Sequence, residues 1–367
     1  MLFRSQAYIT ESDDGINWIK IGDATDGSKY ITSTKEKIKP EGMKKSRFVH
    51  KGDFILSNSM SFGRPYILAV DGCIHDGWLV IHDDSNRFDK NYLYYYLGSP
   101  NIYNEFKRLA VGGVVNNLNS ELVRSVNVCI PPRAEQERIV AELDCLRGVI
   151  ERKREQLKQL DALAQSIFYQ MFGDPITNEE RWEVKKLGEV CKTTSGGTPS
   201  KGHNEYYEGG TIPWLRSGEV NKMYIYDTEL FITEEGLQKS SAKWFPVDTV
   251  VIAMYGATVG QVGILKNKMT TNQAICGIFP NKEFTPIYLY HFLLSKKDDY
   301  IAMAAGGAQP NISQNIIRDT LVCCPTIAQQ QLFAERIDRI EQQKKLISQS
   351  IKEVEDLFNS RMDYYFN

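Results

Sequence analysis

Apolar residues recur at alternating spacings of four and three along residues 134–171. This heptad pattern predicts one long helix whose apolar seam faces a partner helix. Pro132 suits the start of this helix and Gly173 suits its end. The predicted seam consists of Ile139, Leu143, Leu146, Ile150, Leu157, Leu160, Ala164, Ile167 and Met171, and Lys153 interrupts it.

The same spacing returns along residues 328–361, so the chain supplies a partner helix of its own. Thr326 and Gln329 have the spacing of a capping box at its start. Each interrupting lysine either extends its ammonium group past the helix flank or fixes the register of the pair, and we favour the second interpretation. The second seam consists of Phe333, Ile337, Ile340, Ile347, Ile351, Val354 and Phe358, and Lys344 interrupts it.

The two predicted helices belong to an internal repeat, because they align without a gap at an offset of 194 residues. Within the helices, Gln136 matches Gln330 and Asp144 matches Asp338. A repeat of this length predicts two copies of one structural unit. The alignment starts upstream of the helices, with the pairs Gly112-Gly113 and Gly306-Gly307, and Asn117 and Asn311.

The repeat divides the chain into four parts. These are a first mixed domain over residues 1–130, a helical region over 131–173, a second mixed domain over 174–325 and a second helical region over 326–367. Trp214-Leu215-Arg216 matches Trp18-Ile19-Lys20, but the two mixed domains otherwise diverge. We therefore expect a shared scaffold whose domains contact different targets. Apolar runs predict strands at 16–21, 54–56, 66–70, 78–82, 126–130 and 182–190, and an aromatic helix from 92 to 106.

The composition is that of a globular protein. The chain has 367 residues, of which 42% are hydrophobic and 25% charged. No apolar run approaches a membrane span and no signal peptide is recognisable, so we expect no membrane partner. Seven cysteines without CxxC pairs favour a reducing cytoplasm over a disulfide framework. The net charge of −2 means that any DNA-binding face must be a local patch.

Several short motifs give the chain a resemblance to a known family. Gly196-Gly197-Thr198-Pro199-Ser200, Ile212-Pro213-Trp214-Leu215-Arg216 and Thr271-Asn272-Gln273-Ala274 occur in that order, after Trp182 and Leu187-Gly188-Glu189. Pro-x-x-x-Gln precedes both helices. In this layout the chain resembles the DNA-specificity subunit of type I restriction-modification systems.

The resemblance implies an α+β fold with two target-recognition domains, separated by two long antiparallel coiled-coil helices and related by a pseudo-twofold axis. It implies double-stranded DNA as the ligand, with each domain reading half of a split site. It also implies two modification subunits, which carry S-adenosylmethionine and methylate adenine, and restriction subunits that cleave DNA using ATP. The chain itself would hold no cofactor and have no catalytic residues.

The first domain departs from this layout. Trp18 is the counterpart of Trp214 but lies near the start, so the first half has no equivalent of residues 182–200. Three explanations are open: an abbreviated first domain, a true start further upstream, or a cassette from a recombining locus.

Motifs for independent catalysis are missing from the sequence. It contains neither an Asp/Asn-Pro-Pro-Tyr/Phe methylation motif nor a GxxxxGK[ST] phosphate loop. Asp174, Glu183 and Lys185 fit a loose nuclease pattern, but solvent-facing strand residues are the simpler interpretation. The five histidines lack metal-ligand spacing. A stand-alone nuclease or methyltransferase and a protein-only scaffold remain the alternatives to a DNA-recognition subunit.

Candidate DNA contacts are polar and basic residues in or near glycine-containing loops. Arg, Lys, Asn and Gln match base edges, and Lys, Arg, Ser and Thr bind phosphates. For each single residue, a solvated or turn position is an equally good interpretation. The candidates are Lys20, Lys44, Lys45, Arg47, Asn58 and Arg64 in the first domain, and Ser195, Thr198, Lys201, Arg216, Tyr255, Gln261, Asn272 and Gln273 in the second.

Overall fold

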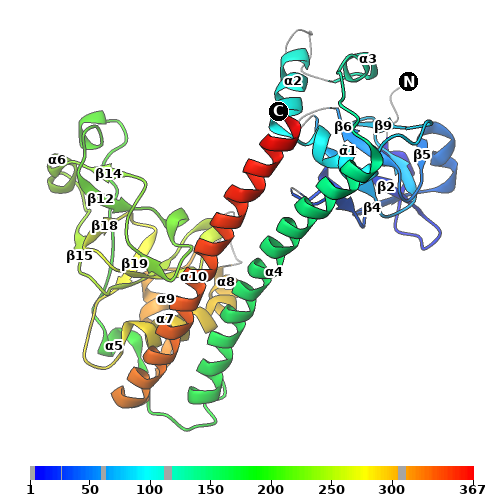
Figure 1. Ribbon diagram of the computed structural model, residues 1–367. Coiled ribbons are helices and arrows are strands. Elements are labelled where there is room, and N and C mark those ends of the chain that lie inside the picture. Colours follow the sequence, from blue (N-terminus) through cyan, green and yellow to red (C-terminus); the bar gives the residue numbers. More distant parts are fainter. Residues whose placement is uncertain (1–4, 26, 59–62, 111–117, 305–310) are drawn as a thin grey trace. The chain divides into compact units, whose positions relative to one another are not determined.

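The computed structural model describes residues 5–25, 27–58, 63–110, 118–304 and 311–367. The chain forms two compact units. The first unit contains residues 1–154 and 349–367, and the second contains residues 155–348. Each unit therefore combines one mixed domain with one end of each long helix (Figure 1). The predicted turns at Gly112-Gly113, Asn117 and Gly306-Gly307 lie outside the described residues.

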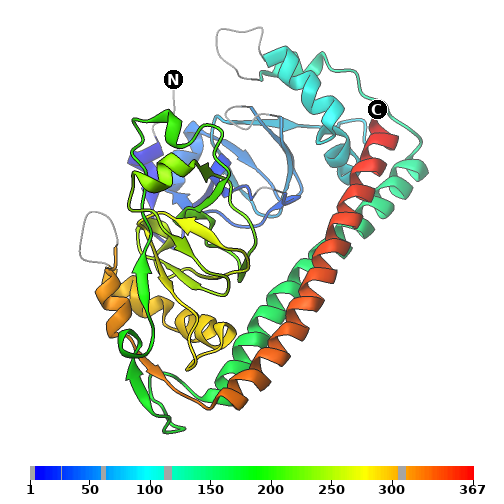
Figure 2. The same cartoon turned by 90° about the vertical axis from the view of Figure 1, so that its left-hand side faces the viewer.

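The two long helices are α4 (Arg133–Phe172) and α10 (Ile327–Phe366), each of 40 residues. Helix α10 continues past the predicted end at Arg361, because Met362 and Phe366 are buried in the first unit's core. There the side chains of Arg361 and Tyr365 bind Glu142 of α4, at 2.8 and 2.6 Å. Figure 2 shows the same end of α10, in red, beside the cyan helices of the first unit.

The second unit holds the opposite ends of both helices. Lys344 of α10 pairs with Asp161 of α4 at 2.8 Å, and Phe333 packs edge-on against Phe172. Within each unit, the contacting segments of α4 and α10 thus run antiparallel. The sequence placed Ile167 and Met171 in the seam, but the structure buries their neighbours Phe168 and Phe172 more fully.

The described residues of the first unit form two sheets. Its larger sheet has the order β1-β4-β2-β8-β5, and the smaller has the order β3-β7-β6-β9. The strands are β1 (Ile9–Thr10), β2 (Ile16–Ile19), β3 (Tyr30–Ile31), β4 (Glu36–Ile38), β5 (Arg47–Val49), β6 (Phe54–Ser57), β7 (Pro65–Leu68), β8 (Gly72–Ile74) and β9 (Trp78–Ile81). The helices are α1 (Lys90–Leu97), α2 (Pro100–Ala110) and α3 (Ser120–Arg124).

The second unit repeats this plan with one strand pair more. Its sheets have the orders β11-β19-β16-β17-β13, β14-β12-β18-β15 and β10-β20. The strands are β10 (Val184–Lys186), β11 (Thr193–Ser195), β12 (Ile212–Leu215), β13 (Tyr224–Ile225), β14 (Phe231–Ile232), β15 (Trp244–Phe245), β16 (Val250–Ala253), β17 (Val262–Leu265), β18 (Met269–Thr271), β19 (Ile275–Ile278) and β20 (Leu321–Cys323). The helices are α5 (Leu187–Val190), α6 (Glu234–Gln238), α7 (Pro286–Ser295), α8 (Lys297–Ala304) and α9 (Gln314–Asp319).

The repeat is visible in the strand register. Trp18 on β2 faces Cys73 on the parallel strand β8, and Trp214 on β12 faces Thr270 on the parallel strand β18. Both indole rings are buried. Lys20 follows β2 and Arg216 follows β12, so these two residues occupy equivalent positions in the two units.

Three sequence-based assignments are wrong. The aromatic helix is two helices, because Pro100 lacks an N–H and starts α2. Residues 182–190 contain the short strand β10 and then helix α5. Residues 126–130 form no strand, although the equivalent strand β20 pairs with β10. Among its described residues the first unit offers no such partner strand, and the Cys129 amide donates to the Tyr96 hydroxyl instead, at 3.0 Å.

Burial varies along the predicted seam. The buried seam residues are Ile139, Leu143, Ile150, Ala164, Phe333, Ile337, Ile340 and Ile351. All of them belong to the core of one unit except Ile150 and Ile351, which lie near the points where the units divide. Leu146, Lys153, Leu157, Leu160, Lys344, Ile347, Val354 and Phe358 are half-buried. Each domain thus contributes core to the helix end that it holds, and the remaining seam positions are covered less completely.

Candidate nucleic-acid interface

A basic residue follows the buried tryptophan strand in both units. Lys20 and Arg216 each begin a single 3₁₀ turn, which ends at Asp23 and Glu219 respectively. The amide of Lys20 donates to Asp23 Oδ2 at 2.8 Å, and the amide of Arg216 donates to Glu219 Oε1 at 3.2 Å. This acidic cap fixes the backbone from which each basic side chain projects.

Neither basic side chain is isolated. Arg216 contacts Glu219 through Nε at 3.3 Å and Glu229 through Nη2 at 2.5 Å. Lys20 pairs with Glu36 of β4. The sequence prediction identified the two cations but missed these acidic partners. Their signal was weak, because each ion pair joins two residues that are 13 or 16 positions apart along the chain.

The glycine-rich loop of the second unit lies against the same strands. A Cβ on Gly196 would lie 2.1 Å from Thr271, and one on Gly197 would lie 2.2 Å from Ser241. The Trp214 indole donates to the carbonyl of Gly197 at 2.9 Å. Only glycine fits these positions, so the close packing holds the loop beside β12 and β18.

This packing brings several predicted DNA contacts together. Thr198 hydrogen-bonds Gln273, and the amide of Asn272 donates to the Leu215 carbonyl at 2.9 Å, next to Arg216. The buried Oδ1 of Asn272 has no hydrogen-bond partner among the described residues. We call this group the second-unit polar cluster, and it consists of Thr198, Arg216, Asn272 and Gln273. Ser195 lies on β11 next to Gly196 and pairs with Cys276 of β19. Lys201 is exposed on the same loop.

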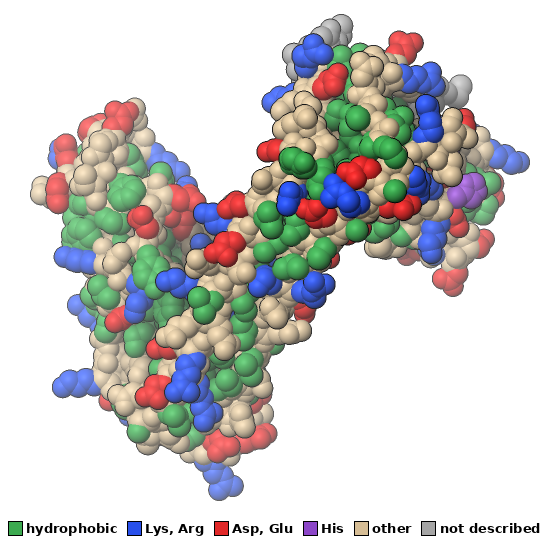
Figure 3. All heavy atoms as spheres, viewed as in Figure 1, with side chains coloured by type: hydrophobic (Ala, Val, Ile, Leu, Met, Phe, Trp, Pro, Cys, Tyr) green, Lys and Arg blue, Asp and Glu red, His purple; other side chains and the backbone are tan. Residues whose placement is uncertain are grey.

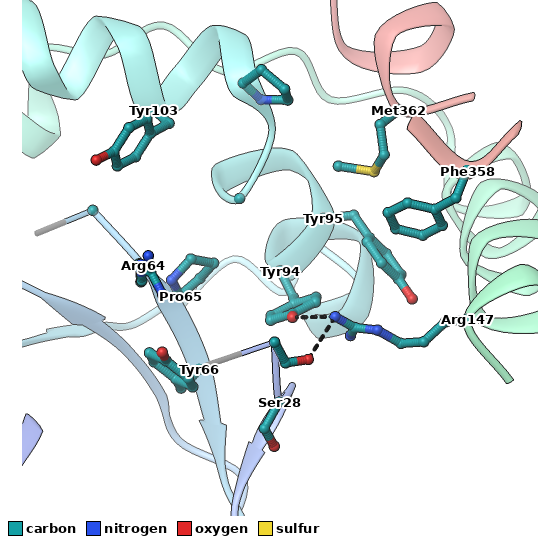
Figure 4. Close-up of a pocket in the computed structure, with 14 residues that line it drawn as sticks. Ser28, Arg64, Pro65, Tyr66, Tyr94, Tyr95, Tyr103, Arg147, Phe358 and Met362 are labelled. Atoms are coloured by element: carbon teal, nitrogen blue, oxygen red, sulfur yellow. Dashed lines mark hydrogen bonds between the residues drawn. The ribbon is translucent and has the colours of Figure 1, made fainter. Parts of the chain in front are cut away.

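Other candidates lie elsewhere. Gln261 lines a cavity of about 1000 Å³ together with Asp161 and Lys344 of the long helices. Arg64 lines a cavity of about 430 Å³ in the first unit, where Arg147 of α4 donates to the Tyr94 hydroxyl at 2.9 Å (Figure 4). Both cavities are lined in part by the long helices, with Arg147 and Phe358 in the first unit and Asp161 and Lys344 in the second. Tyr255 is 44% exposed and pairs in an isolated bridge with Asn311.

The remaining first-unit candidates form no single cluster. Lys44 and Arg47 are exposed, and Lys45 donates to the Tyr8 hydroxyl at 2.6 Å. The Asn58 side chain donates to the Asp76 carbonyl at 2.9 Å, which is a turn-stabilising role. Figure 3 shows basic and acidic side chains interspersed over the face in view of each unit. The described residues of the face in view therefore carry no continuous basic surface.

The titratable groups of the described residues do not form a metal centre. No group of three potential metal ligands occurs among them. His291 of α7 is buried between Phe168 and Phe333. Burial, together with the charge of Lys344, lowers the pKa of His291 to about 3, so the ring is neutral near pH 7.

Every helix in the described part of the chain is too short or too polar to cross a lipid bilayer.

Comparisons with known proteins agree with this repeat. The chain is 28% identical over 204 residues to the EcoR124I/EcoR124II specificity subunit of Escherichia coli, a match that covers 54% of this chain and 50% of that protein. It is 25% identical over 355 residues to the putative MjaX specificity subunit of Methanocaldococcus jannaschii, covering 90% of this chain and 79% of that protein. The chain thus spans about half the length of the E. coli relative.

Solved structures share the fold. A chain from a study of complex assembly and conformational transition of the type I R-M system superposes with a TM-score of 0.62 at 19% identity, covering 96% of this chain and 91% of its own. The type I restriction-modification S subunit from M. genitalium gives a TM-score of 0.54 at 14% identity, covering 99% and 91%.

The family model for the type I restriction modification DNA specificity domain matches twice, over residues 5–162 and 179–356. The first match begins in the first mixed domain and ends in α4, and the second begins before β10 and ends in α10. Each match thus spans one mixed domain and part of the long helix that follows it. Because the two matches cover nearly the whole chain, the protein belongs to the type I restriction modification DNA specificity family.

Proposed function

We propose that this chain is the DNA-recognition subunit of a type I restriction-modification complex. Each unit binds one half of a bipartite site in double-stranded DNA. The observation that carries this proposal is the double match to a DNA specificity domain, once in each half of the structural repeat. Divergent domains on a common scaffold suit two half-sites of different sequence.

The second-unit polar cluster is the part that we assign to base and phosphate contact. Gln273 is exposed and carries an amide group that matches an adenine edge, and Arg216 has the fork that matches guanine or a phosphate. The Oδ1 of Asn272 is buried, so this residue would contact DNA only through its amide nitrogen. Lys201 is exposed, which suits a phosphate contact. In the first unit, Lys20 occupies the position of Arg216, and Lys44, Lys45 and Arg47 supply further positive charge.

The two long helices are the part that we assign to spacing and assembly. We propose that α4 and α10 form one antiparallel coiled coil, with Lys153 and Lys344 fixing its register. The Lys344 ammonium pairs with Asp161 across the helices and with Glu341 on its own helix, at 2.8 and 2.6 Å, which supports this role. The repeat offers two equivalent docking surfaces, which suits two modification subunits. Methylation and cleavage are then carried out by those subunits and by restriction subunits.

A methylation map tests this proposal. The full chain is expressed with its modification subunits in cells that lack adenine methylation, and methylated adenines are sequenced. The proposal predicts one bipartite methylated motif. An assembled complex without methylated DNA would support a protein-only scaffold. Methylation or cleavage by the purified chain alone would support an independent enzyme.

A further inference from the structure

The ion pairs at Lys20 and Arg216 use carboxylates from different positions of the repeat. The cap residues are equivalent: Asp23 also accepts from the amide of Lys35, and Glu219 also accepts from the amide of Glu229. The acidic side chains that pair with Lys20 and Arg216 are not equivalent: Glu36 is half-buried, whereas Glu229 is exposed. Glu36 faces Trp18 across β2 and β4, whereas the residue across from Trp214 is Leu230.

Two non-equivalent residues thus supply a carboxylate to the same basic position. The ion pair is therefore not explained by the internal repeat alone. Both units place a carboxylate on the basic residue, but one uses a strand residue and the other uses the residue before Leu230. The Arg216 and Glu229 side chains are 41% and 71% exposed. A pair this exposed stabilises a fold very little. The main effect of the Arg216–Glu229 pair is therefore to limit the binding of the Arg216 guanidinium to other anions.

We propose that Glu229, and Glu36 in the first unit, are specificity-determining residues for DNA. Each holds its basic partner in an internal ion pair that DNA must displace, an inference that rests on the proposed function. On non-matching DNA the pair stays closed and the basic residue adds nothing to binding. On the matching half-site, the surrounding contacts bring DNA close enough to open the pair, and the cation then binds the DNA.

Salt dependence distinguishes this role from a purely structural one. A cation that binds phosphate releases about one counterion, and the affinity then falls more steeply with salt. In the wild type, non-specific binding lacks the contribution of Arg216. In Glu229→Gln, the Nη2 end of Arg216 loses its acidic partner and can bind any phosphate, while Nε keeps its contact with Glu219. The slope of log affinity against log salt should therefore steepen by about 0.9 on non-matching DNA.

The experiment uses the full chain assembled with its modification subunits. Affinities for a duplex with the mapped motif and for one without it are measured between about 50 and 200 mM salt. Glu229→Gln should bind the non-matching duplex about two- to fivefold more tightly, and its preference for the motif should fall. Glu36→Gln should behave in the same way. Glu229 is exposed, so we expect the melting temperature of the variant to match that of the wild type.

Two control variants isolate the pair. Glu235→Gln removes the same charge from an exposed pair between Glu235 of α6 and Lys239, the residue that follows this helix, and should leave both affinities unchanged. Arg216→Gln/Glu229→Gln should lose the gain in slope. The inference is overturned if Glu229→Gln matches the wild type, or if either control variant shows the same gain. A wild-type complex without preference for the motif would overturn the proposed function as well.

Discussion

The side-chain oxygen of Gln136, in the first turn of α4, accepts a 2.7 Å hydrogen bond from the amide of Asp89, the residue that caps α1. Its side-chain nitrogen donates to the carbonyls of Arg87 and Pro131 at 2.9 Å. In the second unit, Gln330 accepts from Thr285 at 2.8 Å and donates to two carbonyls at 2.9 Å. One buried glutamine in each unit thus ties the long helix to its domain.

Replacing Gln330 with alanine should destabilise the second unit. The change leaves the buried carbonyl of Pro325 without this partner, and likewise the part-buried Thr285 amide and Glu283 carbonyl, which costs about 2–3 kcal/mol. Gln343→Ala is the control, because Gln343 is exposed on the same helix. Denaturant unfolding would measure both variants. Equal midpoints for the two would show that the glutamine does not hold the joint.

Charge removal at Asp144 and Asp338 should have unequal effects. Asp144 pairs at 2.7 Å with Lys29, which is only 8% exposed, whereas Asp338 accepts from the neutral Tyr224 hydroxyl at 3.0 Å. Asp144→Asn leaves a buried ammonium without a counter-ion, and we expect a loss of about 1–3 kcal/mol after allowing for the partial exposure of Asp144.

Asp338→Asn is the matched control at the equivalent position of the repeat. It leaves no charge behind, so the loss should stay below about 1 kcal/mol. Adding Lys29→Met to Asp144→Asn should restore most of the stability, because the buried cation is gone. Unfolding midpoints that fall equally for Asp144→Asn and Asp338→Asn would contradict this explanation.

His291 should make the fold sensitive to acid. Its pKa is about 3 in the folded chain, below the ordinary value of 6.5, so the unfolded chain binds the extra proton between these values. Stability therefore falls as the pH drops below about 6.5, by about 2 kcal/mol at pH 5. Phenylalanine fits among Phe168 and Phe333 without titrating. The difference in unfolding free energy between wild type and His291→Phe should thus change by this amount from pH 7 to 5, and a constant difference would refute it.

Lengthening both long helices should lengthen the spacer between half-sites. An insertion near the end of α4 would displace the buried Phe172, so we place seven residues after Arg154 and seven after Ser348, where the two units divide. Seven residues add about 10 Å and nearly two full turns, and this length corresponds to about three base pairs. Methylated half-sites should keep their sequences while the spacer grows by about three. A methylated motif with the original spacer would show that the helices do not set the distance.

The local part of the structure was predictable from the sequence, because a helix needs only contacts within a few residues. The spacing around Leu143 and Ile337 was enough to locate both long helices. Pairing over longer distances was not predictable. Residues 126–130 look like a strand but lack the partner that β10 provides for β20. The same limit applies to the candidate site, where Arg216 was identified and Glu229 was missed.

The central claim is that each unit reads its own half-site. Its most direct test exchanges residues 174–325 for the corresponding region of a relative that methylates a different bipartite sequence. The exchange leaves α4 and α10 with their own sequences, so the helix pair should still form. The chimeric chain is expressed with the same modification subunits, and methylated adenines are mapped across the genome. We predict that one half of the motif changes to that of the relative while the other half stays the same. A motif that changes in both halves, or in neither, would contradict the account.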